Sequence, residues 1–267
     1  MRAFDYHRPA TLKEAASLLR KNENARALSG GQSLIPALKL RLAAPAALVD
    51  LGAIEELRGI KLDGAVLTVG AMVRHSEVAT SRDVAIGIPA LARLAEDIGD
   101  RQVRNMGTLG GALANNDPAA DYPAAVLGLG ATIHTNKRAI AADKFFLGLY
   151  ETALKRGEII TSVAFPLPKR AAYAKFANPA SRFALVGVFV SEGAGSVRVA
   201  VTGAAPCVFR AKDMEKKLAA NFAPDVLAKV RVPPDGLNSD IHASAEYRAH
   251  LITVMAKRAV AAAVAGK

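Results

Sequence analysis

Hydrophobic residues in the first fifty positions follow a strand, helix, strand, helix, strand order. The segment Thr11-Leu12-Lys13-Glu14 is typical of a capping box, in which a hydroxyl and a carboxylate satisfy free amides at the start of a helix. Pro36 suits the first turn of a second helix, because a proline there removes no helical hydrogen bond. The pattern predicts a small α/β unit built from strand 4–9, helix 11–19, strand 25–28, helix 34–42 and strand 47–51.

The next part of the chain begins with alternating apolar and polar positions, which indicate strands. Asp63-Gly64 is a turn signal between two such runs, 60–62 and 65–69, and predicts a hairpin. We expect Asp117-Pro118 to start a helix whose first turn holds a carboxylate. The other elements expected here are helices 76–79, 89–98, 122–129 and 145–154, a hairpin of 131–134 with 139–141, and strand 157–165.

Pro166 and Pro168 close the last of these strands and mark a boundary between two parts of the chain near residues 168–170. Beyond the boundary, three apolar runs are typical of strands and three other segments of helices. A three-stranded antiparallel sheet backed by helices fits that order. The expected strands are 172–176, 183–190 and 197–202, with a turn at 192–195, and the expected helices are 211–220, 224–229 and 244–264.

The composition narrows the class of protein. With 267 residues, 51% of them apolar, the chain can build two or three folded units with cores of their own. A net charge of +11 does not indicate nucleic acid, because the basic residues are dispersed beside acidic ones and do not alternate with stacking aromatics. The N-terminus lacks a signal-peptide pattern and no apolar run reaches the roughly eighteen residues that cross a bilayer, so we expect a cytoplasmic protein without a transmembrane segment.

Cysteine and histidine contents limit the metal chemistry of this chain. Cys207 is the single cysteine, which excludes an internal disulfide and a cysteine-ligated iron–sulfur or zinc site. The five histidines are scattered without ligand spacing. We therefore predict no metal site, and no arrangement of acid–base or nucleophilic groups indicates a catalytic residue. A metal centre that works with this protein would belong to another polypeptide.

Two glycine-rich segments give the strongest chemical signal. Ser29-Gly30-Gly31-Gln32-Ser33 and Gly107-Thr108-Leu109-Gly110-Gly111 each lead into a predicted helix. Glycine lets backbone approach a large anion, and free N–H groups at a helix start bind diphosphate, so two such loops predict a dinucleotide-type cradle. No G-x-G-x-x-G follows a strand and no G-K-[ST] is present, which excludes Rossmann and P-loop sites. Ordinary turns remain an alternative interpretation of either loop.

Longer segments resemble one protein family. The stretches SGGQSLIP at 29–36, QVRNMGTLGG at 102–111 and NDPAAD at 116–121 are similar to the signatures of the FAD-binding (medium) subunit of molybdenum hydroxylases. The aerobic carbon monoxide dehydrogenase type is the nearer resemblance and xanthine dehydrogenase the more distant one. Residues 177–188 and 240–248 resemble the C-terminal domain of the same flavoproteins, so the resemblance spans almost the whole chain.

The resemblance implies a fold and a division into domains. The fold is α+β, with an FAD-binding domain of the p-cresol methylhydroxylase/vanillyl-alcohol oxidase type over residues 1–168, in two α/β subdomains of about 1–52 and 53–168. Residues 169–267 would form a C-terminal domain of the carbon monoxide dehydrogenase flavoprotein type. That domain would hold the three-stranded antiparallel sheet and helices predicted above.

The resemblance also assigns residues to the cofactor. The backbone of 29–33 and 108–112 would surround the FAD diphosphate, and Asp121 would bind a cofactor hydroxyl. Lys175 matches a position near the flavin, and Phe183 one that often holds a tyrosine against the flavin ring. The implied FAD residues are Ser29, Gly30, Gly31, Gln32, Ser33, Leu34, Thr108, Leu109, Gly110, Gly111, Ala112, Asn115, Asp117, Asp121, Ile159, Ile160, Lys175 and Phe183.

Several of these assignments have a structural alternative. Ser33 and Thr108 suit helix N-caps, and Asp121 suits the first turn of a helix. Phe183 could equally lie in the core of a sheet, and Ile159 and Ile160 in a buried strand. Gln32 stands in the loop where some relatives of this fold attach flavin covalently through a histidine. An amide side chain cannot form that bond, so non-covalent FAD is expected.

The family implies a role in electron transfer. Electrons would pass from molybdopterin in a large subunit, through two [2Fe–2S] clusters of a small subunit, to FAD in this chain and then to a quinone or other acceptor. The implied assembly is a dimer of heterotrimers in the cytoplasm, with possible peripheral association with the inner membrane through the complex. A stand-alone FAD-dependent oxidase or dehydrogenase is the main alternative. A non-redox binding protein, whose glycine loops are only turns, is another.

Overall fold

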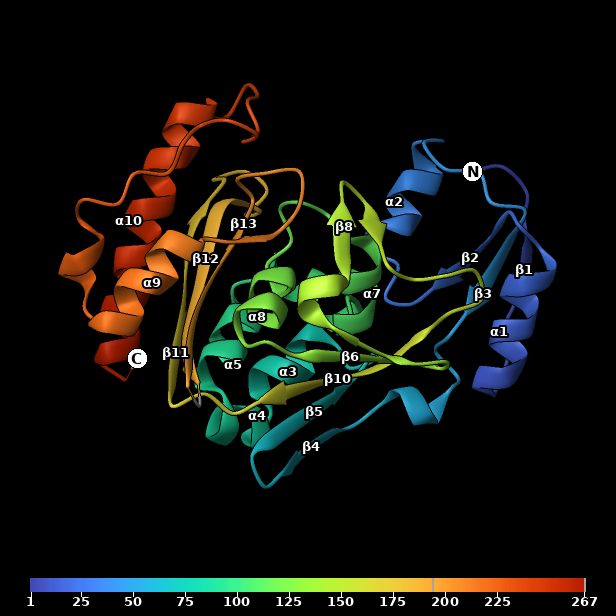
Figure 1. Ribbon diagram of the computed structural model, residues 1–267. Coiled ribbons are helices and arrows are strands. Elements are labelled where there is room, and N and C mark those ends of the chain that lie inside the picture. The colour runs from blue at the N-terminus through green and yellow to red at the C-terminus, as the bar shows by residue number, and fades with distance from the viewer. Residues whose placement is uncertain (194, 267) are drawn as a thin grey trace.

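The computed structural model describes residues 1–193 and 195–266, which fold into three packed units (Figure 1). In the first unit, a parallel sheet of order β1-β3-β2 carries two helices. Helix α1 starts at the predicted cap, where Thr11 Oγ1 accepts a hydrogen bond from the Glu14 N–H at 3.3 Å. The elements are β1 (Asp5–His7), α1 (Leu12–Lys21), β2 (Ala25–Leu28), α2 (Leu34–Lys39) and β3 (Ala47–Asp50).

The second unit is built on an antiparallel sheet of order β4-β5-β10-β6-β7. Both predicted hairpins, around Asp63-Gly64 and around Asn136-Lys137, are confirmed. Helices pack against this sheet and share one apolar core with it. The strands are β4 (Ile60–Asp63), β5 (Val66–Gly70), β6 (Thr132–Thr135), β7 (Ala139–Ala141) and β10 (Ile160–Pro166). The helices are α3 (His75–Thr80), α4 (Arg82–Gly87), α5 (Pro89–Glu96), α6 (Arg101–Met106), α7 (Leu109–Asn115) and α8 (Tyr122–Gly128).

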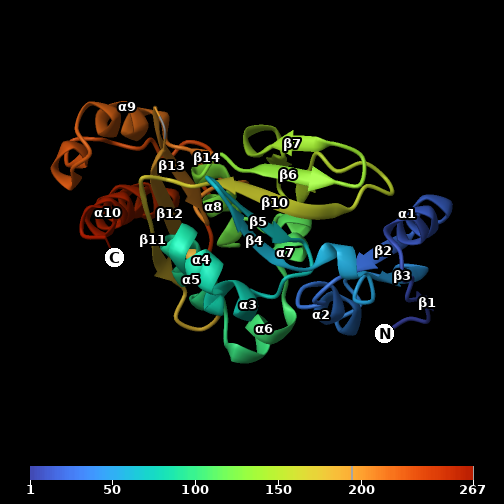
Figure 2. The ribbon, with the colours of Figure 1, turned by 90° about the horizontal axis from the view of Figure 1, so that it is seen from below.

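The third unit is an antiparallel sheet of order β11-β12-β13-β14 between two layers of helices. Figures 1 and 2 show α9 and α10 on one face of this sheet and α5 and α8 on the other, so the sheet joins the C-terminal part to the second unit. The elements are β11 (Arg170–Ala177), β12 (Ala184–Gly193), β13 (Ser196–Thr202), β14 (Phe209–Arg210), α9 (Lys212–Ala220), a 3-10 turn at Pro224–Leu227 and α10 (Ala245–Val264).

The helix predicted for residues 145–154 is wrong. A short 3-10 turn (Ala142–Lys144) precedes this segment, which itself forms the hairpin of β8 (Phe146–Gly148) and β9 (Glu151–Thr152). Tyr150 adopts a φ of +54°, which no helix accommodates. The side-chain amide of Asn116 donates to Gly148 O and Glu151 O, each at 2.8 Å, and fixes the hairpin. A tertiary contact therefore overrides the helical pattern of the segment.

Four further expectations need correction. Asp117-Pro118 does not start a helix, because Asp117 Oδ1 accepts the Ala119 N–H at 2.9 Å and closes a turn instead; α8 begins only at Tyr122. The C-terminal sheet has a short fourth strand, β14, beyond the three predicted. Helices α4 and α6 were not predicted, and α2 ends at Lys39, earlier than expected. The turn expected at 192–195 includes residue 194, which lies outside the described residues.

Membrane and metal signals can be checked over the described residues. Within 1–193 and 195–266, no helix combines the length and apolar character that crossing a membrane requires. The same residues contain no group of three or more histidine, cysteine, aspartate or glutamate side chains placed to hold a metal ion. Cys207 is a half-buried free thiol, and the Asn116 amide nitrogen lies 3.6 Å from its sulfur.

Candidate cofactor site

The first glycine-rich segment connects β2 to α2 and leaves a row of unused amides. The N–H groups of residues 30–34 donate to no acceptor in the part of the chain that the structure describes. Gly31 has a φ of +74°, a left-handed conformation that glycine adopts at little cost. The carbonyls are already used, because Ile35 N–H donates to Gly31 O at 3.0 Å and Ala37 N–H to Ser33 O at 3.2 Å. Such a row of donors at a helix start is suited to binding an anion, and its residues are half-buried or exposed.

A hydrogen bond joins this loop to the second glycine-rich segment. Ser29 Oγ lies 2.7 Å from Thr108 Oγ1, across 79 positions of sequence. The backbones also touch, since a Cβ built on Gly30 would lie 2.0 Å from Met106 O and 2.7 Å from the Gly107 Cα. Only glycine at position 30 permits this approach. The structure therefore brings the two predicted loops together into one surface.

The second segment contributes fewer amides than expected. All N–H groups of residues 109–112 are donated within the protein, so the prediction that they are free for a diphosphate is wrong. Their acceptors, in order, are Val73 O, Ala71 O, Thr108 Oγ1 and Thr108 O, at 3.0, 2.8, 3.1 and 3.1 Å. The lack of a side chain at Gly110 lets α7 pack closely against Ala71, because a Cβ at position 110 would lie 2.6 Å from the Ala71 Cβ. The segment can therefore offer a ligand the Thr108 hydroxyl and a glycine-containing backbone that a ligand can approach closely.

His75 packs against the second glycine-rich segment at Gly107. Its N–H donates to Gly107 O at 2.9 Å, and a Cβ on Gly107 would lie 2.5 Å from His75 Nε2. The imidazole is 5% exposed, and among the described residues its Nδ1 has no hydrogen-bond partner. Burial, together with the charge of Arg104, lowers the pKa of His75 to about 4. The ring is therefore neutral at physiological pH.

We expect acid to destabilise the protein through His75. Because its folded pKa of about 4 lies below the ordinary 6.5, the unfolded chain takes up the proton first, and stability falls as pH decreases through that window. The loss from this side chain is about 3 kcal/mol. Urea unfolding at neutral pH and near pH 4 measures it. His75→Gln should show a shallower decline, whereas His242→Gln, at an exposed position, should follow the parent protein. Equal pH dependence in all three proteins would contradict this role.

Asp121 forms a buried polar network that links the second and third units. The Tyr173 hydroxyl donates to Asp121 Oδ1 at 2.6 Å, and Lys175 Nζ lies 3.1 Å from the same oxygen. Lys175 also donates to Asp97 O at 2.8 Å. Asp121 is 5% exposed, and the Lys175 side chain is 7% exposed. Burial raises the pKa of Asp121 above its ordinary value, while Lys175 and Tyr173 favour the charged form.

The sequence pointed to two members of this network and missed the third. Asp121 and Lys175 were singled out by the family resemblance, whereas Tyr173 was not. Tyr173 stands two residues before Lys175 on β11, so both side chains leave the strand on the same face. The two-residue spacing of Tyr173 and Lys175 in a predicted strand could have indicated this, because a tyrosine and a lysine on the same face of a strand can both contact one carboxylate.

Comparison with known proteins decides the family. A family model described as the FAD binding domain in molybdopterin dehydrogenase matches residues 2–168. The chain belongs to this family. The resemblance to FAD subunits of molybdenum hydroxylases, predicted from the motifs, is thereby confirmed.

Relatives of this FAD-binding family match the chain along nearly its whole length. The nicotine 6-hydroxylase medium subunit of Paenarthrobacter nicotinovorans is 34% identical over 97% of this chain and 96% of its own. The carbon monoxide dehydrogenase medium chain of Hydrogenophaga pseudoflava is 33% identical over the same shares. Among solved structures, reconstituted CO dehydrogenase from Oligotropha carboxidovorans has a TM-score of 0.90 and 35% identity, covering 99% of this chain and 98% of that one. These relatives are subunits of oxidoreductases, as expected.

Phe183, which this family resemblance placed against the flavin ring, lies outside the sheet core. β12 begins at Ala184, and Phe183 ends the preceding loop with half of its surface exposed. Asn178 Oδ1 holds that loop by accepting the N–H groups of Ala180 and Ser181. The alternative interpretation of Phe183 as a core residue is therefore wrong. An exposed aromatic ring on a fixed loop is available for contact with a ligand.

Helix capping accounts for some of the polar residues assigned to FAD in this family and leaves others free. Thr108 caps α7, where its hydroxyl accepts the Gly111 N–H at 3.1 Å. Ser33 precedes α2 and Asp121 precedes α8, but neither side chain makes a capping hydrogen bond. The capping alternative is therefore realised for Thr108 and not for Ser33. In the first glycine-rich loop, Gln32 and Ser33 are exposed, and Leu34, which follows them, is half-buried.

The remaining residues assigned to FAD lie at the ends of neighbouring elements. Ile159 and Ile160 are each 4% exposed and pack in the cores of the first and second units, respectively. Asn115 is the last residue of α7 and is half-buried. Asp117 closes the turn that follows. Their contact with FAD stays a prediction.

Proposed function

We propose that this chain binds FAD non-covalently between its two glycine-rich loops and serves as the electron-transfer subunit of a molybdenum hydroxylase. The observation that carries the proposal is the row of N–H groups at 30–34, free of acceptors in the described chain and held beside Thr108 by the 2.7 Å contact from Ser29. A diphosphate is the kind of ligand that such a row of donors binds. Membership of the FAD-binding family supplies the identity of the nucleotide.

Each part of the site has its own task in this proposal. The amides of 30–34 would hold the diphosphate, and the exposed Ser33 hydroxyl would add a side-chain donor. Thr108 would close the opposite side of the loop pair. Tyr173 and Lys175 both contact Oδ1 of Asp121, so Oδ2 would accept the hydrogen bond of a cofactor hydroxyl. Phe183 would cover a face of the ring system, and the amide of Gln32 offers no nucleophile for a covalent link.

The redox chemistry would come from the cofactor and from partner subunits. When bound, FAD supplies a carrier that accepts electrons from iron–sulfur clusters and releases them to a quinone or another acceptor. This chain would position that carrier and shield it from water. We place the [2Fe–2S] clusters in a small subunit and molybdopterin in a large one, in a dimer of heterotrimers in the cytoplasm. Residues 1–168 would be the FAD domain, of the p-cresol methylhydroxylase type, and 169–267 the C-terminal domain.

Purification of the tagged chain from its native host tests this proposal. The visible spectrum, the flavin released by acid precipitation, and metal analysis are measured on the same sample. Flavin, iron and molybdenum in a fixed ratio to the chain support the proposal. Flavin without metals or partner subunits would favour a stand-alone flavoenzyme. A colourless protein that takes up no added FAD would overturn the cofactor assignment.

The Thr108→Val variant removes the hydroxyl of this side chain while keeping its branched shape. The variant loses both the contact with Ser29 and the cap on α7, so we expect FAD affinity to fall roughly tenfold and unfolding free energy to fall by about 1–2 kcal/mol. Flavin fluorescence titration and urea unfolding measure the two effects. Ser81→Ala is the matched control, because Ser81 caps α4 away from the loops by accepting the Val84 N–H. An equal loss of FAD affinity in the control would refute the specific role of Thr108.

A further inference from the structure

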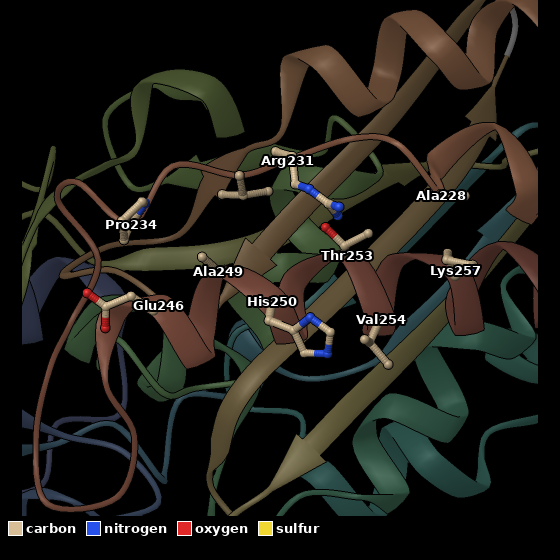
Figure 3. A pocket seen from close by; sticks show the side chains of 10 residues that line it. Ala228, Arg231, Pro234, Glu246, Ala249, His250, Thr253, Val254 and Lys257 are labelled. Atoms are coloured by element: carbon tan, nitrogen blue, oxygen red, sulfur yellow. The ribbon is translucent and has the colours of Figure 1, made fainter.

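A trough of about 570 Å³ runs along α10 on the C-terminal part of the molecule (Figure 3). One wall is α10, and the other is the irregular segment 228–234. Arg231 extends from that segment toward Thr253 on the helix, while His250 and Val254 project from α10 itself. The trough lies on the helix that covers the sheet face opposite α5 and α8 (Figure 1). None of the residues assigned to FAD lines it.

The shape of the trough suits an extended peptide. The lining positions of α10 run from Glu246 to Lys257 and recur at helical spacing, so they form one stripe on the helix. Eleven steps of helix span about 16 Å, the length of roughly five residues of extended chain. Half of the lining residues are apolar, among them Val232 and Val254. An extended peptide, whose side chains point alternately toward and away from the surface, fits such a trough.

The trough carries more basic than acidic side chains. Arg231 and Lys257 line it, against a single carboxylate, Glu246, at one end. Within the described residues, neither Arg231 nor Lys257 has a carboxylate oxygen within 4.0 Å.

Three buried or half-buried arginines of the same unit already have acidic partners. Arg198, Arg210 and Arg248 are each paired with an aspartate or glutamate of this chain. Arg231 and Lys257 have no such partner among the described residues and both line the trough, so an acidic ligand is the complement of their side chains.

We propose that the trough receives an acidic segment of a partner subunit, an extended stretch in which carboxylates flank apolar side chains. Its carboxylates would pair with Arg231 and Lys257, and its apolar residues would cover Val232 and Val254. This inference rests on the proposed function only for the existence of partner subunits. Because the trough is separate from the glycine loops, docking there leaves the FAD site unchanged.

The test uses the tagged full chain in its native host. The double variant Arg231→Glu/Lys257→Glu is compared with Lys216→Glu/Lys217→Glu, which makes the same change of charge at exposed positions of α9. Co-purifying subunits are quantified by mass spectrometry, and flavin content is measured on the same samples. We expect the first variant to lose its partner roughly tenfold at physiological salt, with flavin retained, and the control to resemble the parent.

Zero-length carbodiimide cross-linking of the parent complex locates the contact. We expect an amide between Lys257 Nζ and an aspartate or glutamate in an apolar stretch of one partner subunit. Full assembly of the Arg231→Glu/Lys257→Glu variant, equal loss in the control, or a Lys257 cross-link only to a second copy of this chain would each overturn the proposal. A parent complex that assembles with its partner subunits but carries no flavin would instead count against the cofactor assignment and leave the docking site standing.

Discussion

Replacing Gly30 with alanine is expected to weaken FAD binding severely. The added Cβ would lie 2.0 Å from Met106 O and 2.7 Å from the Gly107 Cα, and neither backbone atom can move away as a flexible side chain could. The two loops must therefore separate, which breaks the Ser29–Thr108 contact and reorients the amides at 30–34. We expect affinity for FAD to fall at least roughly a hundredfold, or about 3 kcal/mol. Flavin fluorescence titration measures the loss.

Gly193→Ala is the matched control for this prediction. Gly193 ends β12 far along the sequence from the loops, and the nearest atom to a Cβ there is Ser196 O at 3.9 Å, an ordinary contact. This variant should keep parental FAD affinity and a stability within about 0.5 kcal/mol of the parent. Should Gly30→Ala bind FAD as well as Gly193→Ala does, the close approach of the two loops would have no part in cofactor binding.

Lys175→Met is expected to lower the free energy of unfolding by about 3 kcal/mol, because it leaves the Asp121 carboxylate buried without its cation. Burial already raises the pKa of Asp121, and loss of Lys175 raises it further. A folded pKa above the unfolded value means that stability is lost as pH rises. The deficit of the variant should therefore be larger in mildly basic than in mildly acidic solution. Urea unfolding at the two pH values measures it.

A double-mutant cycle with Asp121→Asn isolates the pair. In the Lys175→Met/Asp121→Asn protein no buried charge is left unpaired, and an asparagine oxygen can still accept the Tyr173 hydroxyl. The double variant should recover part of the stability that Lys175→Met loses, with its pH dependence removed. It should still bind FAD more weakly than the parent, because the carboxylate assigned to a cofactor hydroxyl is gone. Additive losses without recovery would show that Lys175 does not act through Asp121.

Elements whose cause is local could be predicted from the sequence. The hairpin at Asp63-Gly64 and the helix start at Thr11 rest on neighbours within a few residues, and both formed, although the described residues show only the hydroxyl half of the predicted capping box. The glycine pair at 30–31 predicted a loop whose backbone can approach an anion, but the close contact of Gly30 with the backbone of Met106 and Gly107 was not predicted. The family motifs then brought the residues of both loops and of the C-terminal part into one hypothesis.

Elements fixed by distant contacts could not be predicted. Residues 145–154 are held as a hairpin by Asn116, about thirty positions earlier, and nothing in their own pattern announces that bond. The amides of 109–112 are consumed partly by the carbonyls of Ala71 and Val73, a pairing that appears only in three dimensions. Tyr173 joined the site for the same reason, since its partner Asp121 lies 52 residues away.

The central claim is that the amides of residues 30–34 bind the diphosphate of the cofactor. Amide nitrogen–proton NMR spectra of the isotopically labelled full chain, recorded while ADP and then FAD are added, test it residue by residue. The account predicts large saturable shifts of the resonances of Gly30 to Leu34 with both ligands, and smaller shifts for Leu109 and Gly110, whose N–H groups are already bonded. Saturable binding with shifts confined to other segments would contradict it.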